Sequence, residues 1–375
     1  MSFVKVVEHG TLYANPLPHL RSRQAYFPNA AQLPDGTLAA ACVVGEAFES
    51  VDQKTHLFLS RDGGRTWEPA GPLFPGSLGS KPTCDTAKIT ALPDGRLAAL
   101  GYAFDRSDPE RPLGNPATGG LLHSEAFFVT TTGKDPRSWT TPRVIPNTLG
   151  GPVEASGPLV ALAGGQWATP IANFYDWEGR CAKGLQGRLL RSDDQGRTWN
   201  DRVVTLRFPG DRTTVWEQRL CELEPGHLLV ISWNEDLANN RRLPNHVAFS
   251  KDNGLSFGPP VSTGIMGQTA SAAYLGKGKV LALHCLRRDT DAPGVYACLV
   301  DVAKGGWQVL EQERVWAPAL PIRADKTLAD VFAFVKFGQP SAIRLADGDH
   351  LMVHWQIEDG QGKILWTRLR IEVPR

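Results

Sequence analysis

The sequence lacks several features that would assign it at once to a broad class of protein. Its 40 lysines and arginines are balanced by 39 aspartates and glutamates, so it has no basic excess with which to bind nucleic acid. No apolar run approaches the roughly 18 residues of a membrane-spanning helix. A hydrophobic content of 42% is too high for an intrinsically disordered chain. We therefore expect a folded protein with neither a nucleic acid nor a membrane as its partner.

Signals for metals, cofactors and secretion are also missing. The six cysteines never occur at C-x-x-C spacing, no pair of histidines has metal-ligand spacing, and no glycine pair opens a helix as a phosphate-binding loop does. The first ten residues, MSFVKVVEHG, contain no long apolar stretch of the kind that marks a secretory signal. We expect no metal, no cofactor and a cytoplasmic location. The oligomeric state is left open.

Turn-forming residues are abundant, and they recur at a regular interval. The chain has 38 glycines, 28 prolines and 11 tryptophans, a composition that favours short strands over long helices. Residues 33–38 (LPDGTL) return almost unchanged at 92–97 (LPDGRL), and looser turn signals follow near 164, 226, 277 and 347. The mean interval is about 62 residues, so six such units would occupy almost the whole chain.

A second motif keeps the same phase. Residues 60–67 read SRDGGRTW, residues 192–199 read SDDQGRTW, and residues 250–257 read SKDNGLSF. The pattern S-x-D-x-G-x-[ST]-[WF] suits a hairpin connection, because the aspartate can accept hydrogen bonds from its own turn and the glycine can adopt a positive φ. The aromatic residue at its end can then cover apolar surface between neighbouring sheets.

These two motifs predict an all-β protein, a six-bladed β-propeller of four-stranded antiparallel blades that forms a single domain. The last unit lacks a complete fourth strand, and we expect the N-terminal residues 4–13 to supply it and close the ring. The expected blade boundaries are, in order, 15–75, 76–147, 148–208, 209–264, 265–330, and 331–375 together with 1–14.

The S-x-D-x-G-x-T-W copies and the six-unit count resemble the Asp-box (BNR-repeat) proteins, above all the sialidase/neuraminidase superfamily. The resemblance implies a central pocket with an arginine triad, an aspartate acid/base, and a tyrosine nucleophile activated by a glutamate. Glu217, in the segment WEQRLCEL, stands where the family has that glutamate. Asp52 is the nearest match to the acid/base, with Glu46 and Glu49 as competitors.

The departures from the family are as informative as the matches. The first arginine of the triad is missing where the chain reads YFPN at 26–29, and the second is missing where it reads ISWN at 231–234. Only the third has a counterpart, Arg287 or Arg288, and Gln339 stands at the place of the nucleophile. Without the triad there is no bidentate clamp for a substrate carboxylate, so we expect a substrate other than a standard sialoside.

Polar residues at the starts of the innermost strands and in the loops after the second strands define the predicted pocket. Strand alternation would put Glu217 and Arg219 on one face, where an ion pair is possible. Tyr175, Trp177 and Trp233 could stack on sugar rings. The predicted catalytic residues are Glu217 and Asp52, and the predicted substrate-binding residues are Arg23, Asp85, Glu154, Tyr175, Arg219, Trp233, Arg288 and Gln339.

Paired carboxylates beside aromatic platforms favour glycoside hydrolysis, in which one group protonates the leaving oxygen and the other attacks or activates water. The leading prediction is a sialidase-like hydrolase that acts on a small saccharide other than a sialoside, with anionic saccharides included. One alternative is a non-catalytic propeller that binds glycan or protein, which would be favoured if arginines neutralised every central carboxylate. A third is a lyase on uronic-acid sugars with Tyr175 or His354 as its base.

Overall fold

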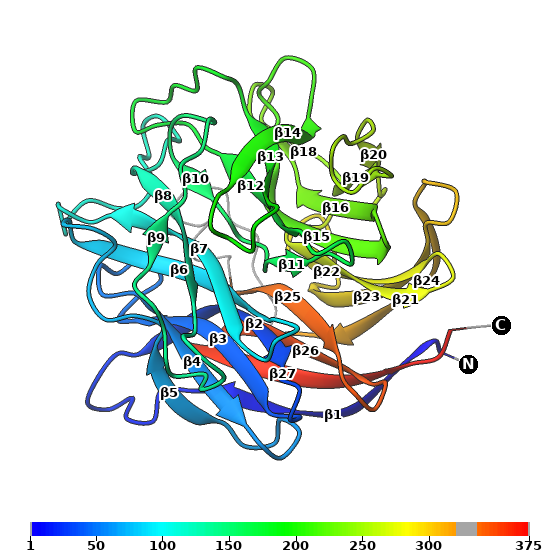
Figure 1. Cartoon of the computed structure of the whole chain (residues 1–375), viewed down its shortest axis with the longest axis horizontal. Helices are drawn as coiled ribbons and strands as arrows, with labels where there is room; N and C mark the ends of the chain where they lie inside the picture. The colour runs from blue at the N-terminus through cyan, green and yellow to red at the C-terminus, as the bar shows by residue number, and fades with distance from the viewer. Residues whose placement is uncertain (1, 320–335, 374–375) are drawn as a thin grey trace.

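The computed structural model describes residues 2–319 and 336–373, and within these ranges every regular element is a β-strand. The strands form six antiparallel sheets arranged around a centre, as Figure 1 shows. No helix that could cross a membrane occurs among these residues. The predicted six-bladed propeller is therefore confirmed. The expected boundary between the fifth and sixth blades, at residues 330 and 331, lies outside the described residues.

The first three blades follow the chain in order, each from its innermost to its outermost strand. Their strands are β2 (Gln24–Gln32), β3 (Leu38–Gly45), β4 (Lys54–Ser60) and β5 (Glu68–Pro72); β6 (Thr83–Ala91), β7 (Leu97–Asp105), β8 (Ser124–Thr130) and β9 (Arg143–Val144); and β10 (Val153–Glu154) with β11 (Val160–Ala161), β12 (Trp167–Asn173), β13 (Gln186–Ser192) and β14 (Asn200–Arg207).

The last three blades continue the same pattern, and a small hairpin, β17 (Glu235–Asp236) with β18 (Arg241–Arg242), extends a loop of the fourth. Their strands are β15 (Trp216–Glu224), β16 (His227–Trp233), β19 (His246–Ser250) and β20 (Val261–Ser262); β21 (Ala270–Gly276), β22 (Lys279–Leu286), β23 (Gly294–Asp301) and β24 (Gln308–Trp316); and β25 (Phe337–Arg344), β26 (His350–Glu358), β27 (Gln361–Ile371) and β1 (Val4–Tyr13).

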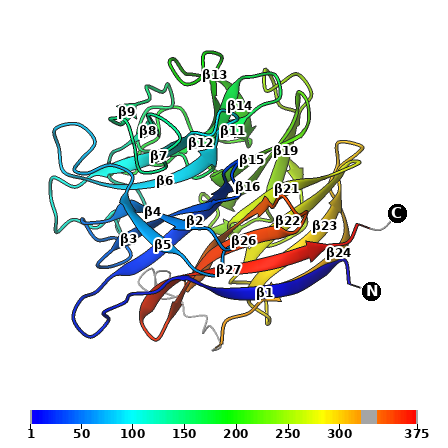
Figure 2. The ribbon, with the colours of Figure 1, turned by 60° about the horizontal axis from the view of Figure 1, so that its bottom comes forward.

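The N-terminal strand closes the ring. β1 runs antiparallel to β27 from the pair Val4 and Ile371 to the pair Tyr13 and Ile364. The two termini consequently lie close together, beside the fifth blade, as Figure 2 shows. The prediction that the N-terminal residues supply the fourth strand of the last blade is confirmed. As a result, β27 has a partner strand on both sides.

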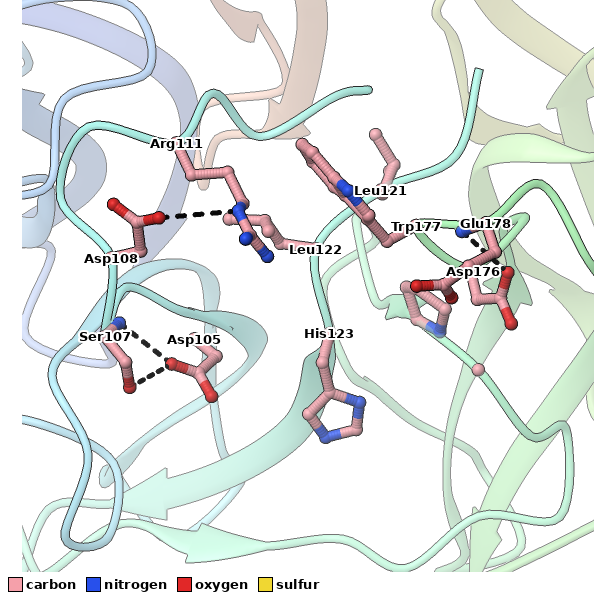
Figure 3. Close-up of a pocket in the computed structure, with 12 residues that line it drawn as sticks. Asp105, Ser107, Asp108, Arg111, Leu121, Leu122, His123, Asp176, Trp177 and Glu178 are labelled. Carbon is pink, nitrogen blue, oxygen red and sulfur yellow. Dashed lines mark hydrogen bonds and ion pairs between the residues drawn. The ribbon is translucent and has the colours of Figure 1, made fainter. Parts of the chain in front are cut away.

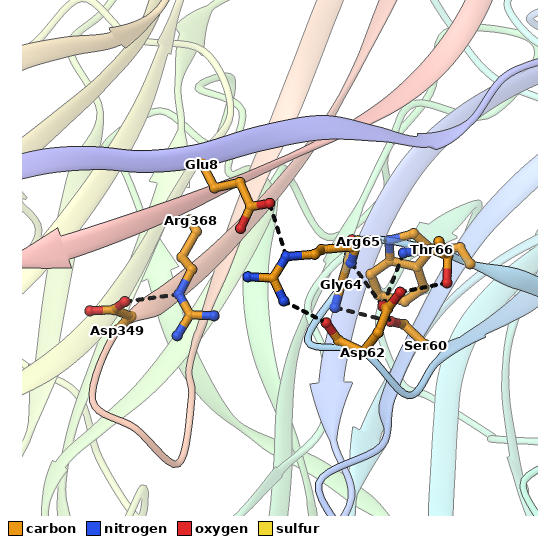
Figure 4. A network of polar contacts seen from close by, with 9 residues as sticks. Glu8, Ser60, Asp62, Gly64, Arg65, Thr66, Asp349 and Arg368 are labelled. Carbon is orange, nitrogen blue, oxygen red and sulfur yellow. Dashed lines mark hydrogen bonds and ion pairs between the residues drawn. The ribbon is translucent and has the colours of Figure 1, made fainter.

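The S-x-D-x-G turns are held by side chains of the turn itself. In the first copy Asp62 accepts hydrogen bonds from the backbone N–H and the hydroxyl of Thr66, at 3.0 and 2.6 Å, and from the hydroxyl of Ser60 at 2.8 Å. Arg65 reaches from this turn to Glu8 of β1, at 3.1 Å, and so joins the first blade to the last (Figure 4). The copies at residues 192–199 and 250–257 repeat the aspartate contacts.

Apolar side chains fill the space between neighbouring blades. One cluster joins the first two blades through residues such as Leu57, Ile89 and Phe127, and comparable clusters lie at the other junctions. The second strands are the most deeply buried elements; every residue of β3 is buried, for example. Side chains with charge are therefore expensive inside the ring, and those that occur there call for a specific partner.

Three innermost strands depart from regular geometry at equivalent places near their starts. β2, β15 and β25 each contain a register shift, and each shift includes one non-glycine residue with positive φ: Phe27 (56°), Glu217 (50°) and Gln339 (47°). Such left-handed conformations are costly for residues with a Cβ, and they cluster at functional sites. The bulges belong to the first, fourth and sixth blades, and they locate the candidate site.

Candidate functional site

Glu217 is the centre of a hydrogen-bonded network that crosses the propeller. Its side chain is half-buried, and its Oε1 accepts a hydrogen bond from Nε2 of Gln339 in the sixth blade. Its Oε2 accepts one from the hydroxyl of Thr269, immediately before the fifth blade. Three blades therefore meet at one carboxylate. The bulge at Glu217 turns its side chain into this position and breaks the strand alternation that the sequence alone suggests.

Lys88 fixes the direction of these hydrogen bonds. Its buried ammonium, on β6, donates to the side-chain Oε1 of Gln339 at 2.8 Å and to the backbone carbonyl of Phe27. A lysine side chain has donors only, so the amide oxygen of Gln339 must face Lys88 and its NH₂ must face Glu217. Glu217 is thereby addressed as an acceptor, which is the role of an ionised carboxylate. Burial, which removes hydrating water, and the positive charge of Arg219 lower the pKa of Lys88 well below its ordinary value.

Glu154 is the second carboxyl group of the network, and it is shielded from water. It lies on β10, is buried, and accepts hydrogen bonds from the backbone N–H of Glu217 and from the hydroxyl of Ser156. Burial and the nearby charge of Glu217 raise the pKa of Glu154 to about 8. At neutral pH Glu154 therefore holds its proton, while both oxygens of Glu217 accept hydrogen bonds, a division of roles that acid–base enzymes use.

Arg219 does not form the ion pair that strand alternation makes possible. Its buried guanidinium donates to the backbone carbonyls of Glu217 and Gln218, at 3.0 and 3.1 Å. Those two carbonyls lie at the bulge of β15, where they lack strand partners. Arg219 therefore holds the backbone of Glu217 in its strained conformation. Burial lowers the pKa of Arg219 from its ordinary value.

Asp52 and Arg23 lie together on the rim of the same face. Their side chains form an ion pair at 3.1 Å, and both are more than one-third exposed. Asp52 also accepts the backbone N–H of Glu46 at 3.0 Å. In both contacts Asp52 is a hydrogen-bond acceptor, whereas a general acid must donate a proton. Of the two competitors, Glu46 is exposed, and Glu49 accepts the backbone N–H of Leu113 in the second blade, with its pKa raised by burial.

Two of the predicted substrate-binding residues, Asp85 and Tyr175, have no hydrogen bond to Glu217. Asp85 is buried between the first two blades, where it pairs with Lys54 at 3.1 Å and accepts the backbone N–H of Thr55 at 2.9 Å. Burial raises the pKa of Asp85 despite these partners. Tyr175 lies in the long loop of the third blade and is half-buried, and burial also raises its pKa. A role in substrate binding stays a prediction for both.

Trp233 and Arg288 form a layered arrangement at the end of β16. Trp233 packs edge-on against Trp216, with ring centroids 5.2 Å apart, and the guanidiniums of Arg287 and Arg288 each lie 5.5 Å from its ring. Arg288 also forms an ion pair with Glu235. The face of Trp233 toward these arginines is therefore occupied, and the charge of Arg288 is already balanced.

An aromatic group stands where the resemblance implies the first arginine of a triad. Tyr26 and Phe27 of β2 pack against Trp355, with ring centroids 5.4 and 6.0 Å away, and Phe27 also packs against Phe48 at 5.5 Å. Phe27 is half-buried, so part of its ring faces the site. This side of the centre offers apolar surface in place of a cationic clamp for a carboxylate.

Four residues predicted from the sequence are brought together by the structure: Glu217, Glu154, Gln339 and Arg219. Lys88 and Thr269 also belong to this network and were not predicted. Lys88 could have been found from the sequence, because it and Asp85 are the only charged residues of the innermost strand β6. Thr269 had no such signal, since a threonine before a strand is unremarkable in composition. Within the residues that the structure describes, no group of three His, Cys, Asp or Glu side chains is placed to hold a metal ion.

No protein-family model and no curated protein sequence matches the chain. Solved structures do match. A Dyadobacter fermentans protein of unknown function is 21% identical with a TM-score of 0.72, and the match covers 99% of this chain and 100% of that one. Trypanosoma rangeli sialidase in complex with the inhibitor DANA is 15% identical with a TM-score of 0.61, covering 92% of this chain and 55% of that one.

A Hadza microbial sialidase is 15% identical with a TM-score of 0.63, over 92% of this chain and 65% of its own. The chain thus spans between 55% and 65% of the length of these two sialidases. At such identities the likeness concerns the fold and not the chemistry. The chain has the six-bladed propeller fold of the sialidases.

Proposed function

We propose that this protein is a glycoside hydrolase whose general base is Glu217 and whose substrate is a saccharide other than a standard sialoside. The observation that carries the proposal is the carboxyl pair at the centre of the propeller. Glu217 is half-buried and has hydrogen-bond donors on both oxygens, while the pKa of its buried neighbour Glu154 is raised to about 8. Paired carboxyl groups with separated protonation states suit hydrolysis of a glycosidic bond.

In the proposed reaction Glu217 takes a proton from a water molecule, and the resulting hydroxide attacks the anomeric carbon as the bond to the leaving oxygen breaks. Glu154 retains its proton, so that Glu217 carries the only negative charge of the pair. Asp52 remains the proposed donor to the leaving oxygen, and it must first take up a proton from solvent before it can give one up. For this role Asp52 must exchange Arg23 for substrate, which would also free Arg23 to contact sugar hydroxyls.

The surroundings of Glu217 support a substrate without a carboxylate at the reacting sugar. The half-buried side chains of Phe27 and Phe48 offer apolar surface, and Arg219 and Arg288 already have partners within the protein. The apolar face of a neutral sugar ring packs well on such aromatic side chains.

The alternatives have less support. A purely binding propeller would be favoured by central carboxylates neutralised by arginine, but the donors to Glu217 are an amide and a hydroxyl. A lyase with His354 as its base is disfavoured because His354 is fully buried against Trp316, and burial lowers its pKa to about 3.

The test is a screen of aryl glycosides, including uronides and a sialoside, with the wild type, Glu217→Gln and the control Glu224→Gln. Glu224 lies at the other end of the same strand and is exposed. We expect the wild type and the control to hydrolyse at least one glycoside, and Glu217→Gln to lose about 1,000-fold or more in kcat/KM. Equal activity in all three proteins would remove Glu217 from the mechanism, and an inactive wild type would refute the hydrolase.

A further inference from the structure

We infer that a cavity between the second and third blades is a distal saccharide subsite, so that the ligand of this protein is an oligosaccharide. The cavity has a volume of about 360 Å³, within the range of small-molecule sites. The loop after β7 and the loop after β12 form its walls, as Figure 3 shows. The inference rests on the proposed function for its catalytic consequence, although binding can be measured without catalysis.

The cavity lies on the same face as Glu217 and is continuous in sequence with the central network. Gly151 and Pro152 line it, and Glu154 follows only two residues later on β10. The cavity is thus built at the start of an innermost strand, as the central site is. A saccharide chain with its reacting unit at Glu217 can therefore extend outward over the junction of the second and third blades.

Trp177 supplies an aromatic platform in this cavity. It is half-buried and packs beside Leu122, Cys84 and Phe104, which hold its ring in place. The guanidinium of Arg111 lies 4.9 Å from its ring centroid. In Figure 3 Arg111 extends toward the ring of Trp177, whereas the ring of His123, which also lines the cavity, points away from both. An indole face suits the C–H face of a sugar ring, and in the proposed complex the sugar takes the place of the Arg111 guanidinium against Trp177.

The two loops are fixed in place before any ligand binds. The backbone carbonyl of Trp177 accepts hydrogen bonds from the side chains of Asn115 and Thr118, both at 2.8 Å. The backbone N–H of Leu121 donates to the carbonyl of Tyr175 at 2.9 Å. At Gly120 a Cβ would lie 1.7 Å from the carbonyl oxygen of Asp176, so only glycine permits this approach. A preformed pocket avoids the entropic cost of ordering its loops.

The polar groups of the cavity are mainly acceptors whose charges are already balanced. Lys81 pairs with Asp105 at 2.7 Å, and Arg180 pairs with Asp176 at 3.0 Å and with Glu178 at 2.9 Å. The contact with Lys81 lowers the pKa of Asp105 to about 2, and the backbone N–H of Arg180, followed by its side chain, lowers that of Asp176. The carboxylates therefore retain lone pairs for hydroxyl donors without creating a strong negative field. Hydroxyl-rich, neutral ligands fit this combination better than an ion does.

The test measures binding and turnover in the full chain with Trp177→Ala and His123→Ala. His123 is largely exposed, with 62% of its side chain accessible, so its loss should leave the fold intact. Leu255→Ala, at a 63%-exposed position of the turn at residues 250–257, is the matched control. Binding is first screened on a printed array of mono- to hexasaccharides of defined sequence. The affinity for each saccharide that binds is then measured by calorimetry, with every variant made in the Glu217→Gln background.

We expect Trp177→Ala to weaken oligosaccharide binding about tenfold and His123→Ala about threefold, with Trp177→Phe recovering part of the loss and monosaccharides unaffected. Wild-type affinity in both variants, an equal loss for mono- and oligosaccharides, or no binding by any glycan would overturn the inference. Binding that depends on Trp177 in a protein that hydrolyses nothing would keep the subsite and refute the hydrolase. Hydrolysis at the wild-type rate in both variants would refute the subsite and keep the hydrolase.

Discussion

The two faces of the propeller are built from the same repeat, but one face keeps its geometry regular and the other does not. On one face the turns at residues 60–67, 192–199 and 250–257 repeat the same aspartate contacts. On the other, the innermost strands diverge, with bulges at Phe27, Glu217 and Gln339 and a break between β10 and β11. Regularity thus occurs where the hydrogen bonds are local to a turn. Irregularity occurs where side chains from different blades must meet.

The two faces should also respond to pH in opposite directions. The carboxyl group of Glu154 has a raised pKa, so it stabilises the fold less as pH rises. The turn aspartates have lowered pKa values, about 2 for Asp194, so they stabilise the fold less as pH falls. The cause in the first case is burial, and in the second it is the hydrogen bonds from threonine within the turn. Three variants test this contrast.

The largest expected effect is on turnover, in Lys88→Met. Methionine is similar in length but cannot orient the amide of Gln339, so Glu217 loses a fixed donor. We expect kcat on the substrate found in the glycoside screen to fall about 100-fold with little change in KM. The Tm should fall, because the carbonyl of Phe27 and Oε1 of Gln339 lose their donor, so kcat is measured well below the Tm of the variant. Undiminished kcat would show that Lys88 only fills space in the centre.

The second effect is the pH dependence of stability, tested with Glu154→Gln. The folded pKa of about 8 exceeds the ordinary value of 4.5, so the folded state holds a proton that the unfolded state releases between these values. The free energy of unfolding of the wild type should therefore fall across this window, by up to about 1.4 kcal/mol per pH unit.

Urea unfolding at pH 5, 6, 7 and 8 measures that slope, and Glu154→Gln should flatten it. Glu224→Gln, at an exposed position of β15, serves as the control and should keep the wild-type slope. The same slope in Glu154→Gln as in the wild type would mean that another group titrates in this range.

The smallest effect is expected on the regular face, in Asp62→Ala. The turn loses the hydrogen bonds from Ser60, Arg65 and Thr66, but it is exposed and local. We expect the Tm to fall by about 2 °C at neutral pH, with unchanged turnover, and the difference from the wild type to shrink as the aspartate is protonated in acid. A loss of turnover as large as that of Lys88→Met would contradict the separation of the two faces.

Sequence reasoning found the repeat, the fold and most of the central residues because each depends on local patterns. Glycine and aspartate specify a turn wherever they occur, and their spacing counts the blades. Lys88 and Thr269 were missed because their importance lies in contacts with other blades, to Gln339 and Glu217. The predicted ion pair between Glu217 and Arg219 assumed a regular strand and was wrong, since a bulge separates the two residues.

The sequence by itself therefore determined an all-β propeller of six blades, closed by its N-terminal strand, with carboxylates near the centre. Only the tertiary structure decided which of these carboxyl groups is protonated and which accepts hydrogen bonds. The physical reason is that turn geometry depends on residues next to one another in the chain. The protonation of Glu154 instead depends on burial and on the charge of Glu217, which lies 63 positions away along the chain.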